Sequence, residues 1–330
     1  MTDSLPPALV LAAGLGTRLR PLTFCRAKAA VPIAGTPLIR RHLTRLAAQG
    51  VAEAVVNLHH RPETIAAAVG DGVAHGCRVR YSWEPVVLGS AGGPRHAVPL
   101  LGSRFFLING DTLCDVDLGA MLEAHRARGA GVTLAVTTNP SPERYGGVHA
   151  DTAGRVTGFA SRGDPERPPL FVGVQIAEAS VFETLQDGVS TASVGGLYDG
   201  LLATPGRVRI HEVTGRFHEI GTPEDYLTAT WAIGAAEAHG DLFVGRRCHL
   251  DTSARIERSV LWDDVVVGAN CQVTNCILTD GVSLSDGMRL DGRVVLRLAA
   301  MTDQRTEALA MTGAKQLGEL LTVPIEAATA

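Results

Sequence analysis

Residues 8–23 of the chain read ALVLAAGLGTRLRPLT, an apolar run that leads directly into a glycine-rich stretch. The apolar part, residues 8–12, has the length and composition of a buried strand. In the turn that follows, Gly14 and Gly16 carry no side chain, so that backbone N–H groups can approach an anion closely. Arg18 adds a permanently charged, forked donor. The stretch predicts a phosphate-binding loop at the end of the first strand of an α/β fold.

Two other phosphate-binding loops fit this stretch less well. A dinucleotide-binding fingerprint requires a third glycine, but Leu19 stands at that position and Pro21 obstructs the early helix of that motif. A P-loop requires a Gly-Lys-Ser/Thr sequence, which does not follow here.

Strand and helix patterns alternate through the first two-thirds of the chain. Buried strands are expected at residues 8–12, 54–58, 105–108 and 132–137, and amphipathic helices at residues 38–48 and 118–128. This alternation predicts crossover connections and a doubly wound, mostly parallel sheet of the Rossmann-like type. Such sheets bind ligands at the carboxyl ends of their strands. We expect this first domain to cover residues 1–240.

After residue 240 the apolar residues recur in steps of six, with two steps of five. They are Leu250, Ile256, Leu261, Val267, Val273, Leu278, Leu284 and Leu290. This period predicts a short left-handed β-helix of the hexapeptide-repeat type, with about three coils over residues 241–295. A meander of short antiparallel strands remains the alternative. Residues 296–330 are expected to form a terminal helix, which includes residues 316–321, and a frayed tail.

Composition excludes several classes of protein. Hydrophobic residues make up 45% and charged residues 19% of the 330 residues, an ordinary globular balance, and the net charge of −4 argues against a nucleic acid or an anionic membrane as partner. No apolar stretch approaches the roughly 18 residues of a membrane span, and the N-terminus lacks a signal-peptide pattern. The six cysteines are scattered, which predicts reduced thiols in a cytoplasmic protein.

A second stretch extends the glycine-rich motif. Residues 26–39 read RAKAAVPIAGTPLI, and together with the Gly-x-Gly-Thr-Arg-Leu and Pro-Leu-Thr segments the chain resembles the sugar-1-phosphate nucleotidyltransferase family. The resemblance implies an enzyme that joins an NTP to a sugar 1-phosphate and releases pyrophosphate. It implies that Lys28 reaches the phosphates, although the prolines that flank this lysine in the family are alanines here. It also implies nucleotide contacts from Leu11, Ala12, Ala13, Gly14, Gly16, Thr17 and Arg18.

An acidic residue follows the apolar run of residues 105–108. Mg²⁺ prefers one or two carboxylates together with phosphate oxygens. The resemblance implies that the aspartate of the family's Gly-Asp pair is the first metal ligand, which here is Asp111, with Asn109 and Gly110 beside the nucleotide. The resemblance supplies a second ligand, Glu219, which stands where the family usually has aspartate and reaches one methylene further.

The base and sugar contacts also come from the resemblance. Residues 84–93, EPVVLGSAGG, resemble the family's base-binding segment, so that Gly89 would let the flat base approach and Glu84 would hydrogen-bond it.

His59 and His60 are adjacent on an extended chain and point to opposite faces, so we expect loop residues near the site and not a metal pair.

The sugar side departs from the family pattern. Tyr145 and Gly146 match the family's backbone contact to the sugar. Ser161 and Arg162 stand where the family carries glutamate and lysine, and Val172 stands where many relatives carry asparagine or threonine. We expect an altered sugar pocket, for example for an N-acetylmuramate-like or other unusual sugar.

The expected mechanism is an in-line displacement at the α-phosphorus by the sugar phosphate. Arg18 and the loop amides would hold the pyrophosphate, while Lys28 and Mg²⁺ would stabilise the α-phosphate. The β-helix, which resembles that of GDP-mannose pyrophosphorylase-like members, favours mannose-1-phosphate guanylyl transfer narrowly. Uridylyl or thymidylyl transfer, to glucose 1-phosphate, N-acetylmuramate 1-phosphate or an unusual sugar phosphate, stays open. The alternatives from other classes are a non-catalytic regulatory paralogue and a hexapeptide-type acyltransferase.

The short β-helix also predicts a homo-oligomer, most simply a dimer. Its interface would use the β-helix or the terminal helix, and the chemistry would stay within residues 1–240.

Overall fold

Residues 5–301 and 304–325 are described in the computed structural model, and the chain divides into two compact units. Unit 1 comprises Met1–Gly14 and Ile39–His218, and unit 2 comprises Leu15–Leu38 and Glu219–Ala330. The chain thus passes from unit 1 to unit 2 inside the glycine-rich loop, between Gly14 and Leu15, and returns before the second residue of the first long helix. The domain boundary that the sequence places at residue 240 stays a prediction.

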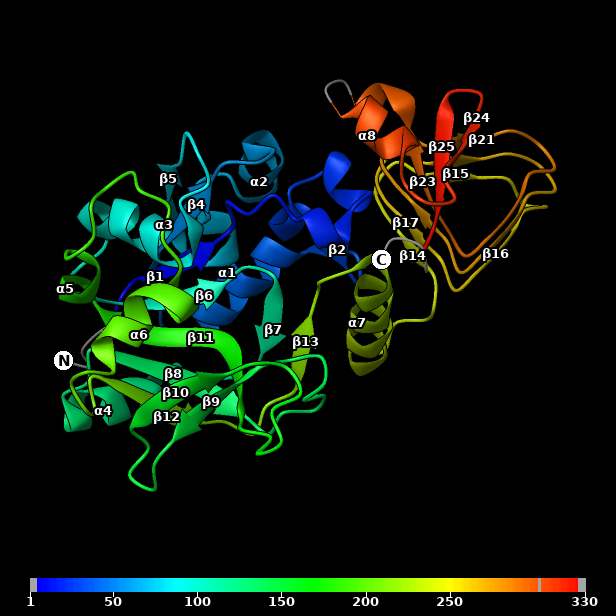
Figure 1. Cartoon of the computed structure of the whole chain (residues 1–330). Helices are drawn as coiled ribbons and strands as arrows, with labels where there is room; N and C mark the ends of the chain where they lie inside the picture. Colours follow the sequence, from blue (N-terminus) through cyan, green and yellow to red (C-terminus); the bar gives the residue numbers. More distant parts are fainter. Residues whose placement is uncertain (1–4, 302–303, 326–330) are drawn as a thin grey trace. The chain divides into compact units, whose positions relative to one another are not determined.

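Unit 1 is built on a seven-stranded sheet, whose strands and surrounding helices Figure 1 labels. In spatial order the strands are β12 (Val208–Glu212), β8 (Val132–Thr137), β11 (Leu170–Glu178), β6 (Arg104–Asn109), β1 (Ala8–Leu11), β4 (Glu53–Leu58) and β5 (Arg78–Trp83). Strand β11 runs antiparallel to β6 and β8, and the other neighbours are parallel. The expectation of a mostly parallel sheet is confirmed.

The central strands are mostly apolar because helices cover the sheet. Leu9, Phe105, Leu107 and Leu134 belong to one core cluster and are fully buried. This pattern is typical of parallel strands, which are buried on both faces. The helices are α1 (Leu38–Ala48), α2 (Pro62–Val69), α3 (Gly89–Ala97), α4 (Leu118–Arg128), α5 (Ala179–Phe182) and α6 (Tyr198–Leu201). The bounds of α1, α4 and β8 agree with those expected from the sequence.

Three short strands and their partners complete unit 1. Strand β7 (Thr112–Cys114) follows β6 after a two-residue turn, and β9 (Gly147–Ala150) pairs antiparallel with β10 (Val156–Ala160). The boundary between the units falls inside β13 (Phe217–Glu219).

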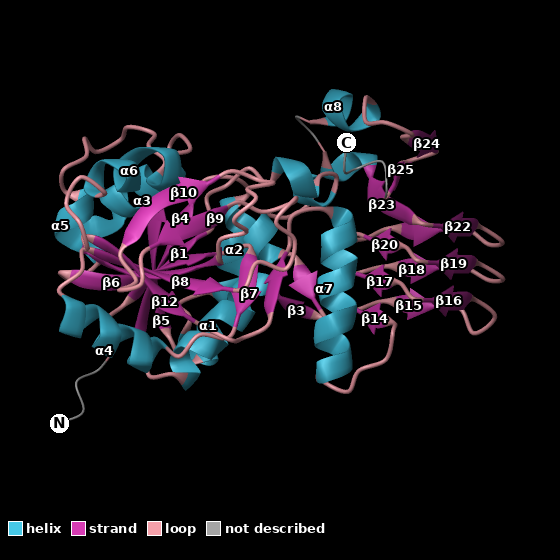
Figure 2. Cartoon of the chain, turned by 60° about the horizontal axis from the view of Figure 1, so that its bottom comes forward, coloured by secondary structure: helices cyan, strands magenta, loops and turns pink. Residues whose placement is uncertain are grey.

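Unit 2 contains the predicted left-handed β-helix, and Figure 2 shows its coils stacked. Its three parallel ladders are β14 (Phe243–Val244), β17 (Val260–Leu261), β20 (Ile277–Leu278) and β23 (Arg293–Arg297); β15 (His249–Leu250), β18 (Val266–Val267) and β21 (Ser283–Leu284); and β16 (Arg255–Glu257), β19 (Gln272–Thr274) and β22 (Arg289–Asp291).

Register explains the spacing seen in the sequence. Each residue pairs with the one 17 positions further along, as Ile256 does with Val273. A coil of 17 residues has two sides of six residues and one of five, which is why steps of five interrupt the steps of six. Val267, Val273 and Leu284 point into the coil and are at most 2% exposed. Because the pairing is parallel, the alternative of an antiparallel meander is wrong.

The segment after the β-helix differs from the expected terminal helix. Residues 316–321 lie in a hairpin of β24 (Lys315–Leu317) and β25 (Leu320–Pro324), and β25 pairs antiparallel with β23. Leu321 and Val323 are fully buried there, and Gly318 turns the chain with a φ of 60°. Pairing with an open sheet edge therefore outweighs the helix propensity of this segment. A short helix, α8 (Arg305–Leu309), precedes the hairpin, and the frayed end expected at residues 326–330 lies outside the described residues.

The rest of unit 2 consists of the loop Leu15–Leu38 and one long helix. The loop contains the hairpin of β2 (Pro32–Ile33) and β3 (Thr36–Pro37). Helix α7 (Pro223–Ala236) begins with a capping box, in which Thr222 and Asp225 each accept a hydrogen bond from the other's backbone N–H. None of the helices within residues 5–301 and 304–325 has the length and apolar character that a membrane span requires.

Candidate active site

The carboxyl ends of β1 and β6 lie side by side in unit 1. Leu11 pairs with Asn109, and the Gly110 N–H donates to the Leu11 carbonyl at 2.9 Å. A Cβ at residue 110 would lie 2.3 Å from that carbonyl oxygen, so the close approach requires glycine. Asp111 follows directly and is half-buried. The structure therefore brings the expected metal ligand next to the expected nucleotide residues Leu11, Asn109 and Gly110.

A bulge in β11 supports the same edge. The register of β11 against β8 shifts between Phe171 and Gln175, where Gly173 has a φ of 80°. A Cβ at residue 173 would lie 2.6 Å from Thr112 Oγ1 and 2.9 Å from Asn109 Cβ. The Thr112 hydroxyl donates to the carbonyl of Val172, which is the expected sugar residue. Val172 is buried, and only its backbone takes part in this contact.

Glu84 does not have the surroundings expected for a contact to the base. The carboxylate is fully buried, and its two oxygens accept hydrogen bonds from Asn57 Nδ2 at 2.7 Å and from the Leu88 N–H at 3.0 Å. Asn57 Oδ1 in turn accepts from the Ala12 N–H at 2.6 Å. The chain of bonds links the first residue after β1 to the loop before α3. We therefore assign Glu84 to the support of these two loops.

Gly89 begins α3 with a φ of 78°, a conformation that favours glycine. A Cβ there would lie 2.7 Å from the Thr191 carbonyl oxygen. Two residues of α3, Gly92 and Gly93, pack equally closely against Val189 and the Glu84–Asn57 pair. Backbone packing is thus one reason for glycines in this segment.

Three further expected sugar residues, Tyr145, Gly146 and Arg162, lie directly before β9 or after β10. Asn139 Nδ2 donates to the carbonyls of Tyr145 and Gly146, and the Tyr145 ring meets the Phe217 ring edge-on at 5.8 Å. A Cβ at residue 146 would lie 2.3 Å from the Ala160 carbonyl oxygen. Arg162 is exposed in the turn after β10.

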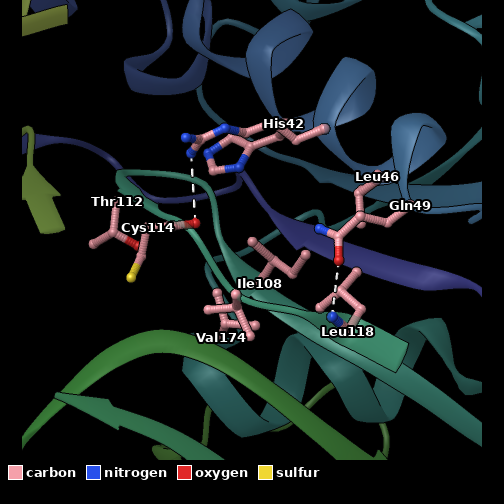
Figure 3. A pocket seen from close by; sticks show the side chains of 10 residues that line it. His42, Leu46, Gln49, Ile108, Thr112, Cys114, Leu118 and Val174 are labelled. Carbon is pink, nitrogen blue, oxygen red and sulfur yellow. Dashed lines mark hydrogen bonds between the residues drawn. The ribbon is translucent and has the colours of Figure 1, made fainter. Parts of the chain in front are cut away.

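A small cavity of about 30 Å³ lies beneath the turn that carries Asp111. Figure 3 shows side chains around it from α1, β6, β7 and β11, among them His42, Thr112 and Cys114, together with Gln49 directly after α1. The volume suits a water molecule and is far too small for a nucleotide. His42 is 5% exposed and hydrogen-bonds the Gly110 backbone. Burial, and secondarily the charge of Arg45, lowers the pKa of His42 to about 4, so this side chain supports the turn as a neutral imidazole.

The glycine-rich loop of unit 2 is tightly folded around Gly16. Gly16 has a φ of 62°, and a Cβ there would lie 2.7 Å from Thr23 Cγ2 and 3.3 Å from Lys28 Cβ. The Thr23 hydroxyl donates to the Gly16 carbonyl at 2.9 Å. The loop thus brings Lys28 next to Gly16, and the sequence predicted phosphate contacts for both residues. Thr17 and Arg18 lie on a 3-10 turn (Thr17–Leu19) and are exposed, while Ala12 and Ala13 in unit 1 are buried and Gly14 is exposed.

Arg18 and Glu219 form an ion pair within unit 2. Arg18 Nη2 lies 2.8 Å from Glu219 Oε1, and the two side chains are 60% and 13% exposed. Gly221 gives room for this pair, because a Cβ there would lie 3.0 Å from Arg18 Nη1 and 3.3 Å from Glu219 Cδ. The sequence predicted separate roles for the two residues, and the structure brings them into contact.

The two expected metal ligands suit magnesium in kind. Asp111 belongs to unit 1 and Glu219 to unit 2. No group of three or more His, Cys, Asp or Glu side chains that could hold a metal occurs in the part of the chain that the structure describes. Mg²⁺ does not require one, because it is typically bound through one or two carboxylates and the phosphates of its substrate. His59 contacts the Glu84 carbonyl at 2.8 Å through Nδ1 and stacks on Trp83, in agreement with a loop role.

Sequence reasoning missed the supporting residues of both units. Asn57 could have been recognised from the sequence, because a polar residue inside the apolar run of β4 requires a buried hydrogen-bond partner. The partners of Arg26, which are Asp263 and Asp280, lie 237 and 254 residues away, and no local pattern connects them.

Comparison with known proteins identifies the family of the chain. Residues 7–198 match the family described as nucleotidyl transferase, and residues 231–292 match the GlmU-like, C-terminal hexapeptide family. The chain belongs to the nucleotidyl transferase family and is an enzyme of that family, which generally uses a divalent metal ion.

Relatives at about 30% identity cover most of the chain. It is 30% identical over 296 residues to the mannose-1-phosphate guanylyltransferase of Mycobacterium tuberculosis, a match that covers 88% of this chain and 82% of that protein. It is 30% identical over 318 residues to a probable mannose-1-phosphate guanylyltransferase of Arabidopsis thaliana, with 89% and 84% covered.

A solved structure, HddC from Yersinia pseudotuberculosis, has a similar fold. The TM-score is 0.61 at 24% identity, over 69% of this chain and 100% of that chain. This likeness concerns the fold alone.

Proposed function

We propose that this enzyme transfers the guanylyl group of GTP to mannose 1-phosphate and releases pyrophosphate. The observation that carries the reaction class is the junction of β1 and β6, where the Gly110 N–H meets the Leu11 carbonyl at 2.9 Å and Asp111 follows. The choice of GTP and mannose 1-phosphate is supported by the similarity to mannose-1-phosphate guanylyltransferases over 88% of the chain.

In the proposed reaction the loop binds and orients, and no covalent enzyme intermediate forms. The backbone N–H groups around Gly14 and Gly16 and the exposed guanidinium of Arg18 would hold the leaving pyrophosphate. Lys28, fixed beside Gly16, would meet the charge that develops on the α-phosphate. The attacking phosphate oxygen is already an anion, so that positioning and charge neutralisation suffice.

Mg²⁺ is the metal that we propose, held by Asp111 and Glu219. When bound, it would supply charge neutralisation at the phosphates. Glu219 would have to share its carboxylate with Arg18, because the pair is already in contact at 2.8 Å. A cytoplasmic location is part of the proposal.

A grid of substrates tests the proposed function. Purified protein with Mg²⁺ is assayed for pyrophosphate release with GTP, UTP, dTTP and ATP against mannose 1-phosphate, glucose 1-phosphate and N-acetylmuramate 1-phosphate. The highest kcat/KM is expected for GTP with mannose 1-phosphate. A preference for UTP or dTTP would replace the guanylyl proposal, and no release in any combination would favour a regulatory paralogue.

We also propose that the enzyme forms a homodimer. Support comes from the short β-helix, on which Val244 and Val266 are 43% and 39% exposed. The inward rungs Val267, Val273 and Leu284 are already buried by their own coils, so the proposal does not rest on them. Light scattering at micromolar concentration should give twice the 34.6 kDa chain mass, and a monomer would contradict the proposal.

A further inference from the structure

Arg26 joins the glycine-rich loop to the β-helix inside unit 2. Its Nε lies 2.7 Å from Asp280 Oδ2 and its Nη2 lies 2.5 Å from Asp280 Oδ1, which is a bidentate pair. The same Nη2 lies 3.1 Å from Asp263 Oδ2. The guanidinium also lies over the ring of Trp262, 5.0 Å from its centroid. A planar fork that pairs and stacks at once is specific to arginine.

The cluster is largely shielded from solvent. The side chains of Arg26 and Asp263 are each 16% exposed, and that of Asp280 is 31% exposed. Burial disfavours the charge on Arg26, but the two carboxylates outweigh it and raise the pKa of the guanidinium. Arg246 shares Asp263, with its Nη2 at 2.8 Å. The ion pairs are therefore held in a fixed geometry, unlike exposed surface pairs.

A second contact ties the other side of the same loop. Trp262 Nε1 donates to the Tyr226 hydroxyl at 3.0 Å, and that hydroxyl donates to the Pro32 carbonyl at 2.7 Å. Trp262 and Tyr226 are at most 1% exposed. The turn Lys28–Ala30 lies between Arg26 and Pro32 along the chain, so that both of its ends are tied to contacts of one corner of the β-helix.

We propose that one corner of the β-helix positions Lys28 for catalysis. This corner consists of Trp262, Asp263 and Asp280. Arg26 is the positioning residue, because it connects this corner to the loop that carries Lys28. Two neighbouring contacts also join the loop to the C-terminal part of unit 2. Cys25 Sγ lies 3.5 Å from Thr279 Oγ1, and Arg20 pairs with Glu307 of α8. The inference rests on the proposed function in one respect, which is that Lys28 meets the phosphates of the substrate. On this proposal the β-helix contributes to catalysis, because its contacts hold the phosphate-binding loop in position.

Kinetics of three variants test the proposal. Arg26→Gln, Asp280→Asn and the double variant are compared with the parent in kcat and in KM for the NTP. Each single change should lower kcat about tenfold or more, because a small displacement of a catalytic group is expensive in rate, while KM for the NTP changes less. The double variant should be no slower than the slower single variant, because both changes break one interaction.

A matched control separates positioning from general stability. Arg247 makes a bidentate pair with Asp264, at 2.6 and 2.7 Å, and this pair joins the first and second coils of the β-helix, outside the Arg26 cluster. Arg247→Gln should leave kcat within about twofold of the parent. Parent-level kcat in folded Arg26→Gln and Asp280→Asn, or equal losses in Arg247→Gln, would overturn the proposal.

Chemical labelling provides a readout that does not depend on activity. The sequence contains two lysines, Lys28 and Lys315, so that Lys315 is an internal reference for an amine-reactive reagent. The labelling rate of Lys28 relative to Lys315 should rise at least about threefold in Arg26→Gln and Asp280→Asn, because the loop opens more often, and stay constant in Arg247→Gln. An inactive parent protein would refute the proposed function, whereas an unchanged Lys28 ratio in both variants would refute this inference.

Discussion

The Glu219 carboxylate pairs with Arg18 and is also a proposed ligand of the metal ion. The carboxylate is 13% exposed and already pairs with Arg18 at 2.8 Å, yet it stands where the family usually has an aspartate ligand. In the proposed site, this ion pair would hold both side chains in place until phosphates and metal enter. Replacement of the glutamate would then affect the position of Arg18 as well as the proposed metal ion.

Variants at Glu219 separate these two effects. Glu219→Asp keeps the charge with a shorter reach and should retain clearly more kcat than Glu219→Ala, which leaves Arg18 without this partner. Titration of activity against Mg²⁺ concentration should show a weaker apparent metal affinity for Glu219→Ala. Parent-level activity of Glu219→Ala at limiting Mg²⁺ would make Glu219 a bystander.

His42 gives unit 1 a defined dependence on pH. Its pKa in the folded protein is about 4, below the 6.5 of the unfolded chain, because it is buried. Between pH 6.5 and pH 4 the unfolded chain binds a proton that the folded chain does not, so stability falls as pH falls through this window. The loss should reach on the order of 3 kcal/mol below pH 4.

Denaturant unfolding without metal, measured between pH 7 and pH 4, checks this dependence. His42→Gln does not titrate and should lose less stability over the window than the parent does, by up to the amount given above. Equal slopes for the two proteins would show that His42 is not responsible.

At the level of elements, the sequence was informative wherever burial is periodic. Continuous apolar runs predicted β1, β4, β6 and β8 to within a few residues, and the steps of six and five predicted all three ladders of the β-helix. The helix predicted at residues 316–321 was wrong because Leu320 and Leu321 suit either a helix or a strand. The strand forms because it pairs with the edge of β23. Such long-range pairing leaves no local trace.

The candidate site was predictable in its residues but not in its connections. The motif indicated Arg18, Lys28 and Asp111, yet nothing local in the sequence says that Arg18 contacts Glu219, 201 residues later. Glu84 shows the same limit, because an acid in a loop pattern gives no sign of whether it faces a ligand or, as here, the Asn57 amide.

For the whole molecule, the unit boundary lies inside the glycine-rich loop, and we propose a coupling that differs from the expected division of labour. The sequence predicted that residues 1–240 work without the β-helix, but the contacts of Arg26 and Tyr226 join the loop to the β-helix in unit 2. The glycine-rich loop and the β-helix should therefore unfold locally in the same opening event.

Native-state hydrogen exchange on the full-length protein tests this coupling. The amide of Cys25, which donates to Leu22, should share the opening free energy of β-helix amides such as Trp262 and should follow them when Asp280→Asn weakens unit 2. Exchange of Cys25 that follows the β1 and β6 amides of unit 1 instead would contradict the coupling.

The most direct test of the account is the transfer reaction itself, measured in the parent and in Asp111→Asn with α-³²P-labelled GTP, mannose 1-phosphate and Mg²⁺. The account predicts label in a sugar nucleotide with the parent enzyme. It predicts a rate lower by roughly a thousandfold or more in a folded Asp111→Asn protein, because the phosphates lose several kcal/mol of charge stabilisation. Near-parent transfer by that variant would contradict the central claim that the carboxylate at the end of β6 serves the chemistry.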